Sequence, residues 1–335
     1  MVRFGIVGTG RISDWVMKGA GQDARIKVVA VCSRTVESAE AFVGRHALAA
    51  GAKIYTSVEE MAADPQVDAI YIGTPNQTHF EYTLASLKAG KHVLCEKPLA
   101  INAEEGRRMV DAARESGCLL MEAMVSTLNP NFRNIATRLD EIAPIHHYSS
   151  YFCQYSSKYE ALKRGEIAAA FMPGTAGALR DVGVYTIYPL VALFGRPSEV
   201  TGKLSTVQTT EGDADVYGTA CLKYDDMDAV LTWSKAYDSF QPTEIAGENG
   251  NLILDEIHIA RKAEIVPHAA PTSGQGPKPG RTLVSEGMPY NEYYYEFKEF
   301  ADLLGSGQRE SSVNSLETSL ITLEIIDQLL GKKIA

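Results

Sequence analysis

The sequence predicts an α/β protein with an N-terminal doubly wound parallel sheet, followed by an α/β domain with an open, largely antiparallel sheet. In the first part of the chain, short β-branched apolar runs alternate with longer segments of helical periodicity, which is typical of β-α-β units. From about residue 145, longer segments alternate between polar and apolar residues. This alternation predicts strands that are covered on one face.

The first part is expected to contain five buried strands, at residues 3–7, 28–31, 69–72, 92–95 and 119–121. Apolar residues recur at helical spacing between them and predict helices at 57–63, 78–89 and 103–116. A single core stops growing at about 250 to 300 residues. The 335-residue chain is therefore expected to form two domains, 1–122 and 123–335.

The second part is expected to contain strands at residues 145–154, 200–208, 216–224, 229–233 and 251–255. Helices are predicted at 184–194, 292–304 and 316–330, and the last is a candidate for packing back on the first domain. Proline, glycine and serine are concentrated in segment 268–281, which lacks a hydrophobic period. This composition predicts a loop.

Composition, charge and the lack of targeting or membrane-spanning patterns disfavour several classes of partner. A formal net charge of −10 without a basic run disfavours nucleic acid. The N-terminus lacks the pattern of a signal peptide, and the longest apolar stretch, 182–195, is too short to span a bilayer. The five scattered cysteines are interpreted as reduced core residues, and the dispersed histidines predict no metal site. We therefore expect a cytoplasmic protein that does not bind membranes.

A glycine-rich turn, Gly8-Thr9-Gly10-Arg11-Ile12-Ser13, directly follows the first predicted strand and opens a helix. Gly8 permits a tight turn, and Gly10 lacks the Cβ that would keep a pyrophosphate from the helix N-terminus. Ser13 replaces the third glycine of this Rossmann pattern but is small enough for close helix–sheet packing. The alternative is a glycine-rich turn without a ligand.

The end of the second strand indicates which dinucleotide binds. An NAD site would place an acidic residue there for the ribose hydroxyls, but the sequence has Ser33 and Arg34. Ser33 can bond a 2′-phosphate, and Arg34 supplies a charge and a planar group that stacks on adenine. The prediction is NADP, with NAD as the alternative cofactor. A solvated arginine at a strand end would be the simpler explanation of Arg34.

Two further segments, Thr74-Pro75-Asn76-Gln77-Thr78-His79 and Glu96-Lys97-Pro98, complete a set of motifs. With the glycine loop, they resemble the Gfo/Idh/MocA family of oxidoreductases. The similarity continues through Glu122 and the segment 177–185, so it covers both predicted domains. The resemblance implies a Rossmann domain and a second α/β domain whose open sheet often packs against another subunit.

The resemblance also implies the site residues. The cofactor would be bound by the glycine loop, Ser33, Arg34, Thr74, Pro75, Asn76, His79, Glu96, Lys97 and Glu122. Lys97, Asp181 and Tyr185 would be catalytic. A parallel sheet binds ligands beyond the carboxyl ends of its strands, where Lys97 and Glu122 lie. Without the family pattern, Lys97 would be a surface lysine, Asp181 a helix cap, Tyr185 a core tyrosine and Glu122 a satisfied carboxylate at a helix start.

Tyr185 indicates the branch of the family. Inositol dehydrogenases of the family place a histidine there, whereas glucose–fructose oxidoreductase, dimeric dihydrodiol dehydrogenase and xylose dehydrogenase use tyrosine. The sequence is similar to the second group, but where dihydrodiol dehydrogenases have a tryptophan, an arginine and then a proline, it has Val125, Thr127 and Pro130. An aromatic residue and a cation are thus missing, so the substrate of the dihydrodiol dehydrogenases cannot be assigned to this protein.

The function that these patterns predict is hydride transfer between a nicotinamide and a sugar, polyol or related cyclic alcohol or carbonyl compound. A homodimer or homotetramer is expected, because the uncovered sheet face needs shielding. Two alternatives are a non-catalytic NAD(P)-binding regulator of the same fold and a redox-neutral enzyme that uses its cofactor transiently. The regulator is disfavoured because Lys97, Asp181 and Tyr185 are retained.

Overall fold

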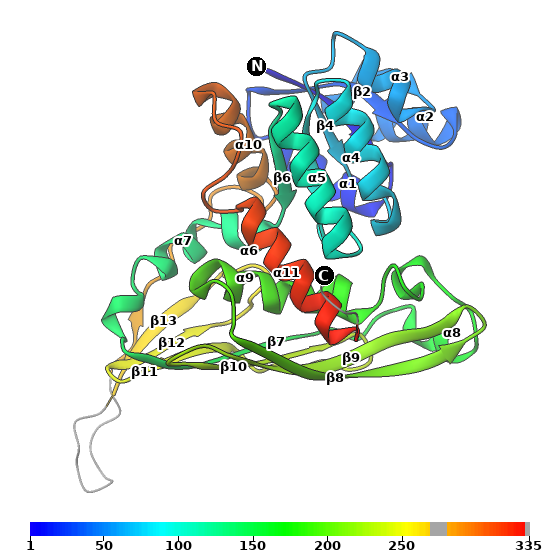
Figure 1. Cartoon of the computed structure of the whole chain (residues 1–335). Helices are drawn as coiled ribbons and strands as arrows, with labels where there is room; N and C mark the ends of the chain where they lie inside the picture. Colours follow the sequence, from blue (N-terminus) through cyan, green and yellow to red (C-terminus); the bar gives the residue numbers. More distant parts are fainter. Residues whose placement is uncertain (269–279, 332–335) are drawn as a thin grey trace, which may run out of the picture. The chain divides into compact units, whose positions relative to one another are not determined.

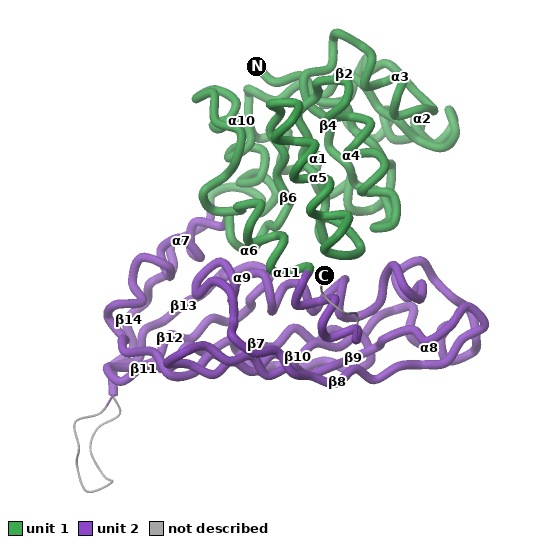
Figure 2. Tube along the Cα trace, in the orientation of Figure 1, with its two compact units in different colours: residues 1–128, 289–323 green, residues 129–288, 324–335 purple. Residues whose placement is uncertain are grey.

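The computed structural model describes residues 1–268 and 280–331. The chain forms two compact units (Figure 2). Unit 1 contains residues 1–128 and 289–323, and unit 2 contains residues 129–288 and 324–335. The predicted boundary was 122/123. In the structure, unit 1 continues to residue 128 and also includes segment 289–323. The predicted loop at 268–281 lies mostly outside the described residues.

Unit 1 is built on a six-stranded sheet of order β3-β2-β1-β4-β5-β6, in which every pair is parallel. Its strands are β1 (Val2–Val7), β2 (Ile26–Cys32), β3 (Lys53–Tyr55), β4 (Ala69–Ile72), β5 (His92–Glu96) and β6 (Leu120–Ala123). This order confirms the predicted doubly wound sheet of the Rossmann type. The sequence analysis missed β3, which has only three residues.

Two apolar cores form on the two faces of this sheet, because neighbouring strand residues point to opposite sides. The α-helices of unit 1 are α1 (Arg11–Ala20), α2 (Val36–Arg45), α3 (Val58–Ala63), α4 (His79–Lys88), α5 (Ala103–Ser116), α6 (Val125–Leu128) and α10 (Tyr294–Ser306). Short 3-10 turns occur at Ala47–Ala49 and Asn76–Thr78. Side chains of Thr35, Ser57 and Asn102 cap α2, α3 and α5, which explains where these helices begin.

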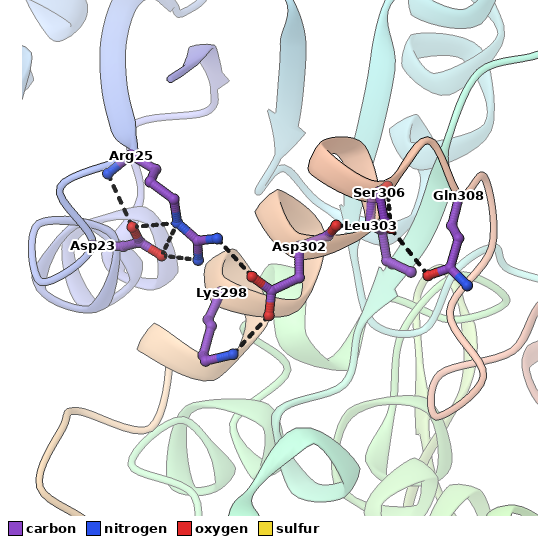
Figure 3. Close-up of polar contacts among 7 residues, drawn as sticks. All are labelled: Asp23, Arg25, Lys298, Asp302, Leu303, Ser306 and Gln308. Atoms are coloured by element: carbon purple, nitrogen blue, oxygen red, sulfur yellow. Dashed lines mark hydrogen bonds and ion pairs between the residues drawn. The ribbon is translucent and has the colours of Figure 1, made fainter.

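Segment 289–323 joins unit 1 through both apolar and charged contacts. Phe297 and Phe300 of α10 lie with ring centroids 5.1 and 5.4 Å from that of Phe4 in β1. Arg25 binds Asp23 and Asp302, each at 2.6 Å, and thereby ties the start of β2 to α10 (Figure 3). These partners lie up to 277 residues apart, so local patterns in the sequence do not reveal the association.

Unit 2 is built on an eight-stranded sheet of order β14-β13-β12-β11-β7-β10-β9-β8 (Figure 1). Its strands are β7 (Ile145–Cys153), β8 (Glu199–Thr209), β9 (Gly212–Lys223), β10 (Asp228–Ser234), β11 (Thr243–Gly247), β12 (Gly250–Leu254), β13 (Ala263–Pro267) and β14 (Thr282–Leu283). Among the strands of the described residues, only the pair β7 and β10 is parallel, which confirms a largely antiparallel sheet.

Helix α9 (Val184–Phe194), whose bounds agree with the prediction, packs on this sheet. A π-helix, Leu179–Gly183, precedes it directly. Unit 2 also has α7 (Pro130–Ala136), α8 (Tyr159–Lys163) and short turns at Leu139–Glu141 and Ala169–Phe171, while α11 (Leu316–Leu329) begins in unit 1 and ends in unit 2.

Exposed and buried residues alternate along β9, so the described residues leave one face of the sheet uncovered at this strand. Cys221 lies on that face and is exposed, which corrects its predicted place in the core; the other four cysteines are buried. Within residues 1–268 and 280–331, no helix is both long and apolar enough to cross a membrane.

Candidate active site

The glycine loop between β1 and α1 has the form that a pyrophosphate requires. Gly8 has a φ of +96°, and a Cβ there would lie 2.6 Å from the carbonyl oxygen of Gly73. Gly10 opens α1 without a side-chain cap, and the space that its Cβ would occupy is open. The helix N-terminus is therefore accessible to an anion, which its N–H groups and dipole attract.

Ser13, which stands in place of the third glycine, is fully buried. A Cβ on Gly73 would lie 2.8 Å from the Ser13 hydroxyl oxygen, so the helix and the sheet approach closely here. The small side chain permits this packing, as expected. Ile12 packs partly buried against the core, and exposed Arg11 lies 5.9 Å from the ring of Trp15.

The end of β2 carries the two residues that were predicted to select the cofactor. The hydroxyl oxygens of Thr9 and Ser33 lie 3.1 Å apart, so the glycine loop and the strand end meet at this point. Arg34 is exposed directly after them. Its guanidinium group is accessible to a phosphate, and no acidic residue occupies position 33 or 34.

His79 connects the loop after β4 to the turn after β5. Its ring nitrogens lie 2.9 Å from the carbonyl oxygens of Pro98 and Thr74, and its side chain is fully buried. Burial lowers the pKa of the imidazole. A neutral ring donates to only one of the two carbonyls, whereas a protonated ring donates to both. The sequence placed His79 among the cofactor contacts, but this burial favours a role in holding the two loops together.

Buried carboxylates fix the turn that carries Lys97, and the Lys97–Pro98 peptide bond is cis. Glu96 accepts hydrogen bonds from the Tyr71 hydroxyl at 2.7 Å and from the Lys97 backbone N–H at 3.3 Å. Glu122 accepts the Leu99 N–H at 3.0 Å. Both residues are buried, Glu96 with 6% and Glu122 with 2% exposure, so they support the turn from the interior of the unit.

Burial also changes the proton affinity of these acids. It raises the pKa of Glu122 to about 7 and the pKa of Glu96 above its ordinary value. A further acid, Glu296 of α10, is buried in the same unit, and burial together with the charge of Glu96 raises its pKa. The sequence analysis missed Glu296, because it lies far along the chain in a helix without a motif.

Asp181 and Tyr185 lie in unit 2, in the π-helix and the first turn of α9. The Asp181 carboxylate binds the Lys235 ammonium group at 2.5 Å. Lys235 also donates to the Ala170 carbonyl at 3.0 Å and lies 4.4 Å from the centre of the Phe171 ring. The sequence analysis missed Lys235, because a single lysine at the end of a strand resembles a solvated residue.

A second carboxylate supports the same π-helix. Asp215 accepts the Leu179 N–H at 2.6 Å, and a Cβ on Gly177 would lie 1.7 Å from its other oxygen. Burial raises the pKa of Asp215, and the positive charges of Arg180 and Lys235 oppose this rise. A π-helix within an α-helical segment often marks a functional site. Here, Asp215 and Lys235, which lie far from the π-helix in the sequence, bind it and stabilise its conformation.

Tyr185 is half-buried and lies against an aromatic pair in the same unit. The Phe152 ring meets it edge-on, with centroids 5.3 Å apart and planes at 87°. The His258 ring stacks on Phe152 at 4.4 Å. These contacts orient the phenol ring. The predicted site residues are thus divided, with the cofactor residues and Lys97 in unit 1 and Asp181 and Tyr185 in unit 2.

Comparisons with known proteins define the class. Residues 2–124 match the GFO_IDH_MocA family, described as an oxidoreductase family with an NAD-binding Rossmann fold, and residues 138–253 match the GFO/IDH/MocA C-terminal domain. The chain belongs to this family, as the sequence motifs predicted. It is an NAD(P)-dependent oxidoreductase, and this membership supports catalysis over a purely regulatory role.

Two relatives that match along nearly the whole chain are dehydrogenases. The NADP⁺-dependent scyllo-inositol 2-dehydrogenase IolU of Bacillus subtilis (strain 168) is 38% identical over 98% of this chain and 96% of its own length. A trans-1,2-dihydrobenzene-1,2-diol dehydrogenase of Xenopus laevis is 30% identical over 98% of this chain and 97% of its own.

A solved structure confirms the fold. KijD10, a 3-ketoreductase from Actinomadura kijaniata in complex with NADP and TDP-benzene, has a TM-score of 0.83 at 23% identity. The superposition covers 98% of this chain and 97% of that one.

Proposed function

We propose that the protein is an NADP-preferring dehydrogenase that oxidises a ring hydroxyl of a cyclic polyol or sugar, or reduces the corresponding ketone. The observation that carries this proposal is the end-to-end similarity to an NADP⁺-dependent inositol dehydrogenase. The exposed Arg34 at the end of β2, without an acidic neighbour at the position of the ribose contact, supports NADP.

The glycine loop would hold the pyrophosphate at the start of α1, and Ser33 and Arg34 would bind the 2′-phosphate. Thr74, Pro75 and Asn76 would line the cleft, while His79, Glu96 and Glu122 keep the Lys97 turn in place from beneath. The bound nicotinamide supplies the hydride acceptor or donor. The protein residues then have to bind the substrate hydroxyl and move its proton.

We assign that proton to Tyr185. An unperturbed tyrosine titrates near ~10, and a neighbouring ammonium group stabilises its phenolate form. Lys97 would supply this positive charge and stabilise the developing alkoxide. Asp181 would bind a second substrate hydroxyl or orient Lys97. The three side chains would therefore act on the same substrate.

A turnover screen tests this function. The purified protein is assayed with NADP and NAD against inositols, other polyols, aldoses and dicarbonyl compounds. We expect NADP-dependent turnover with a cyclic polyol or sugar. Activity only with acyclic dicarbonyls, or no activity with any of the compounds, would contradict the proposal.

We also propose a homodimer or homotetramer in the cytoplasm. The exposed face of the eight-stranded sheet supports assembly, because partner subunits commonly shield such a face. Sedimentation at micromolar concentration should show a species larger than the 36.4 kDa chain. A single species of that mass would contradict it.

A further inference from the structure

We propose that Lys235 is a positioning residue for the reaction, because its buried ammonium group fixes the carboxylate of Asp181 at the site. This inference rests on the proposed function of Asp181. Lys235 follows β10 and lies 54 residues from its partner. It belongs to none of the sequence motifs.

The contacts of Lys235 give its ammonium group one defined location. The Asp181 carboxylate lies at 2.5 Å, the Ala170 carbonyl at 3.0 Å and the Phe171 ring centre at 4.4 Å. An anion, a carbonyl dipole and the face of an aromatic ring are each favourable partners of a cation. These three partners, two of them in the turn Ala169–Phe171 and one in the π-helix, restrict the long side chain to a single arrangement.

The two members of the pair differ strongly in exposure. The Lys235 side chain is 5% exposed, whereas that of Asp181 is 41% exposed. The cation is therefore held inside the unit, and the carboxylate lies between it and the surface. A buried ammonium group is costly unless it is paired, so a lysine is not expected here for packing alone. The arrangement suits a support for a carboxylate that binds something else.

Asp215 completes this support. It binds the Leu179 N–H at the start of the π-helix, while Lys235 binds Asp181 in its middle. The charge of Lys235 also favours the ionised form of Asp215. Loss of the Lys235 ammonium would thus remove a buried partner of the Asp181 carboxylate and weaken the arrangement of the turn that leads into Tyr185.

A double-mutant cycle tests the inference with NADP and scyllo-inositol, or with the best substrate from the turnover screen. The variants are Lys235→Met, Asp181→Asn and the double variant, with Lys88→Met as a control at an exposed position of α4. We expect Lys235→Met to lower kcat/KM by about 10- to 100-fold, because a small displacement of a site residue has effects of this size. The Kd of NADP should remain unchanged, because its predicted contacts lie in unit 1.

In the Asp181→Asn background, Lys235→Met should have almost no further effect on kcat/KM, because the carboxylate that it positions is gone. Lys235→Arg, which keeps the charge, should recover most of the activity, and Lys88→Met should behave as the parent. If Lys235→Met does not fold, the comparison of Lys235→Arg with Lys235→Gln replaces it.

Two results would overturn the inference: an unchanged kcat/KM in Lys235→Met, or an equal loss in the presence and absence of the Asp181 carboxylate. The second result would assign Lys235 a purely structural role. Normal kcat/KM in Asp181→Asn alone would instead overturn the proposed role of Asp181, so the two failures are distinguishable.

Discussion

The two units hold their functional side chains in different ways. In unit 1, the backbone of the Lys97 turn is hydrogen-bonded to three side chains: Glu96 and Glu122 accept its N–H groups, and His79 binds the Pro98 carbonyl. In unit 2, Asp181 is held through its carboxylate by Lys235, which comes from another element. In unit 1 the contacts therefore fix the backbone of the Lys97 turn, whereas in unit 2 an ion pair fixes the Asp181 side chain.

This difference has a consequence for substitution. Where the backbone is fixed, replacing Lys97 should remove its chemistry and leave the turn intact. Where a charge fixes the side chain, a change at Lys235 should propagate to its partner. The substitutions below test this contrast, in order of decreasing effect.

Lys97→Met should have the largest effect. It removes the charge that we propose stabilises the developing alkoxide, and we expect kcat to fall by roughly 10³-fold. The thermal unfolding temperature should stay close to that of the parent, because the turn is held by backbone contacts. Steady-state kinetics and calorimetry measure both quantities, with Lys88→Met at the end of α4 as the control. A strongly lowered unfolding temperature of Lys97→Met would contradict the claim that backbone contacts hold the turn without the Lys97 side chain.

Tyr185→Phe should lower kcat by roughly 10²-fold, because it removes only the hydroxyl that we propose transfers the proton. The ring contact with Phe152 remains, so NADP affinity and stability should change little. Tyr217→Phe, on the exposed face of β9, is the matched control. Near-normal turnover of Tyr185→Phe, with hydride transfer rate-limiting, would move the proton role to Lys97 or another residue.

Arg34→Asp should change the cofactor preference. One charge-assisted phosphate contact contributes about 1.5 to 3 kcal/mol, so the preference for NADP should be lost or reversed. The ratio of kcat/KM for the two cofactors measures the change. A parent enzyme that favours NAD tenfold would show that Arg34 has no such role.

Glu122→Gln should have the smallest effect, on the pH dependence of stability. Burial raises the pKa of Glu122 from 4.5 to about 7, so its contribution to folding is fully present below 4.5 and is lost as the pH rises through 7. Between pH 5.5 and 7.5 the parent should lose about 2 kcal/mol through this group, and the glutamine variant should not. Denaturant unfolding at both pH values measures the difference. Equal pH dependence in the two proteins would exclude an important contribution from Glu122.

Much of the fold was predictable because its signals are local. The periodicity of 184–194 gave α9 with the observed bounds, and the alternation along 216–224 gave most of β9. The strands β11 and β13 were missed, because each has five residues and ends in a glycine or a proline. The association of α10 with β1 depends on contacts between distant residues, such as Phe4 and Phe297, which a local pattern does not reveal.

The same distinction applies to the site. The glycine loop and the Glu96-Lys97-Pro98 segment were recognisable because their residues are adjacent in the sequence. Lys235 and Glu296 were not, because their significance comes from burial beside partners that tertiary folding provides. Sequence motifs thus identified the groups proposed for the chemistry but missed the charges that surround them.

Deuterium transfer tests the central claim most directly. The protein is incubated with NADP and scyllo-inositol deuterated at its ring carbons, or with the correspondingly labelled substrate from the screen, and the NADPH is analysed by mass spectrometry. The account predicts one deuterium atom at C4 of the nicotinamide ring. NADPH without deuterium, or labelled substrate consumed without NADPH formation, would contradict direct hydride transfer from the carbinol carbon.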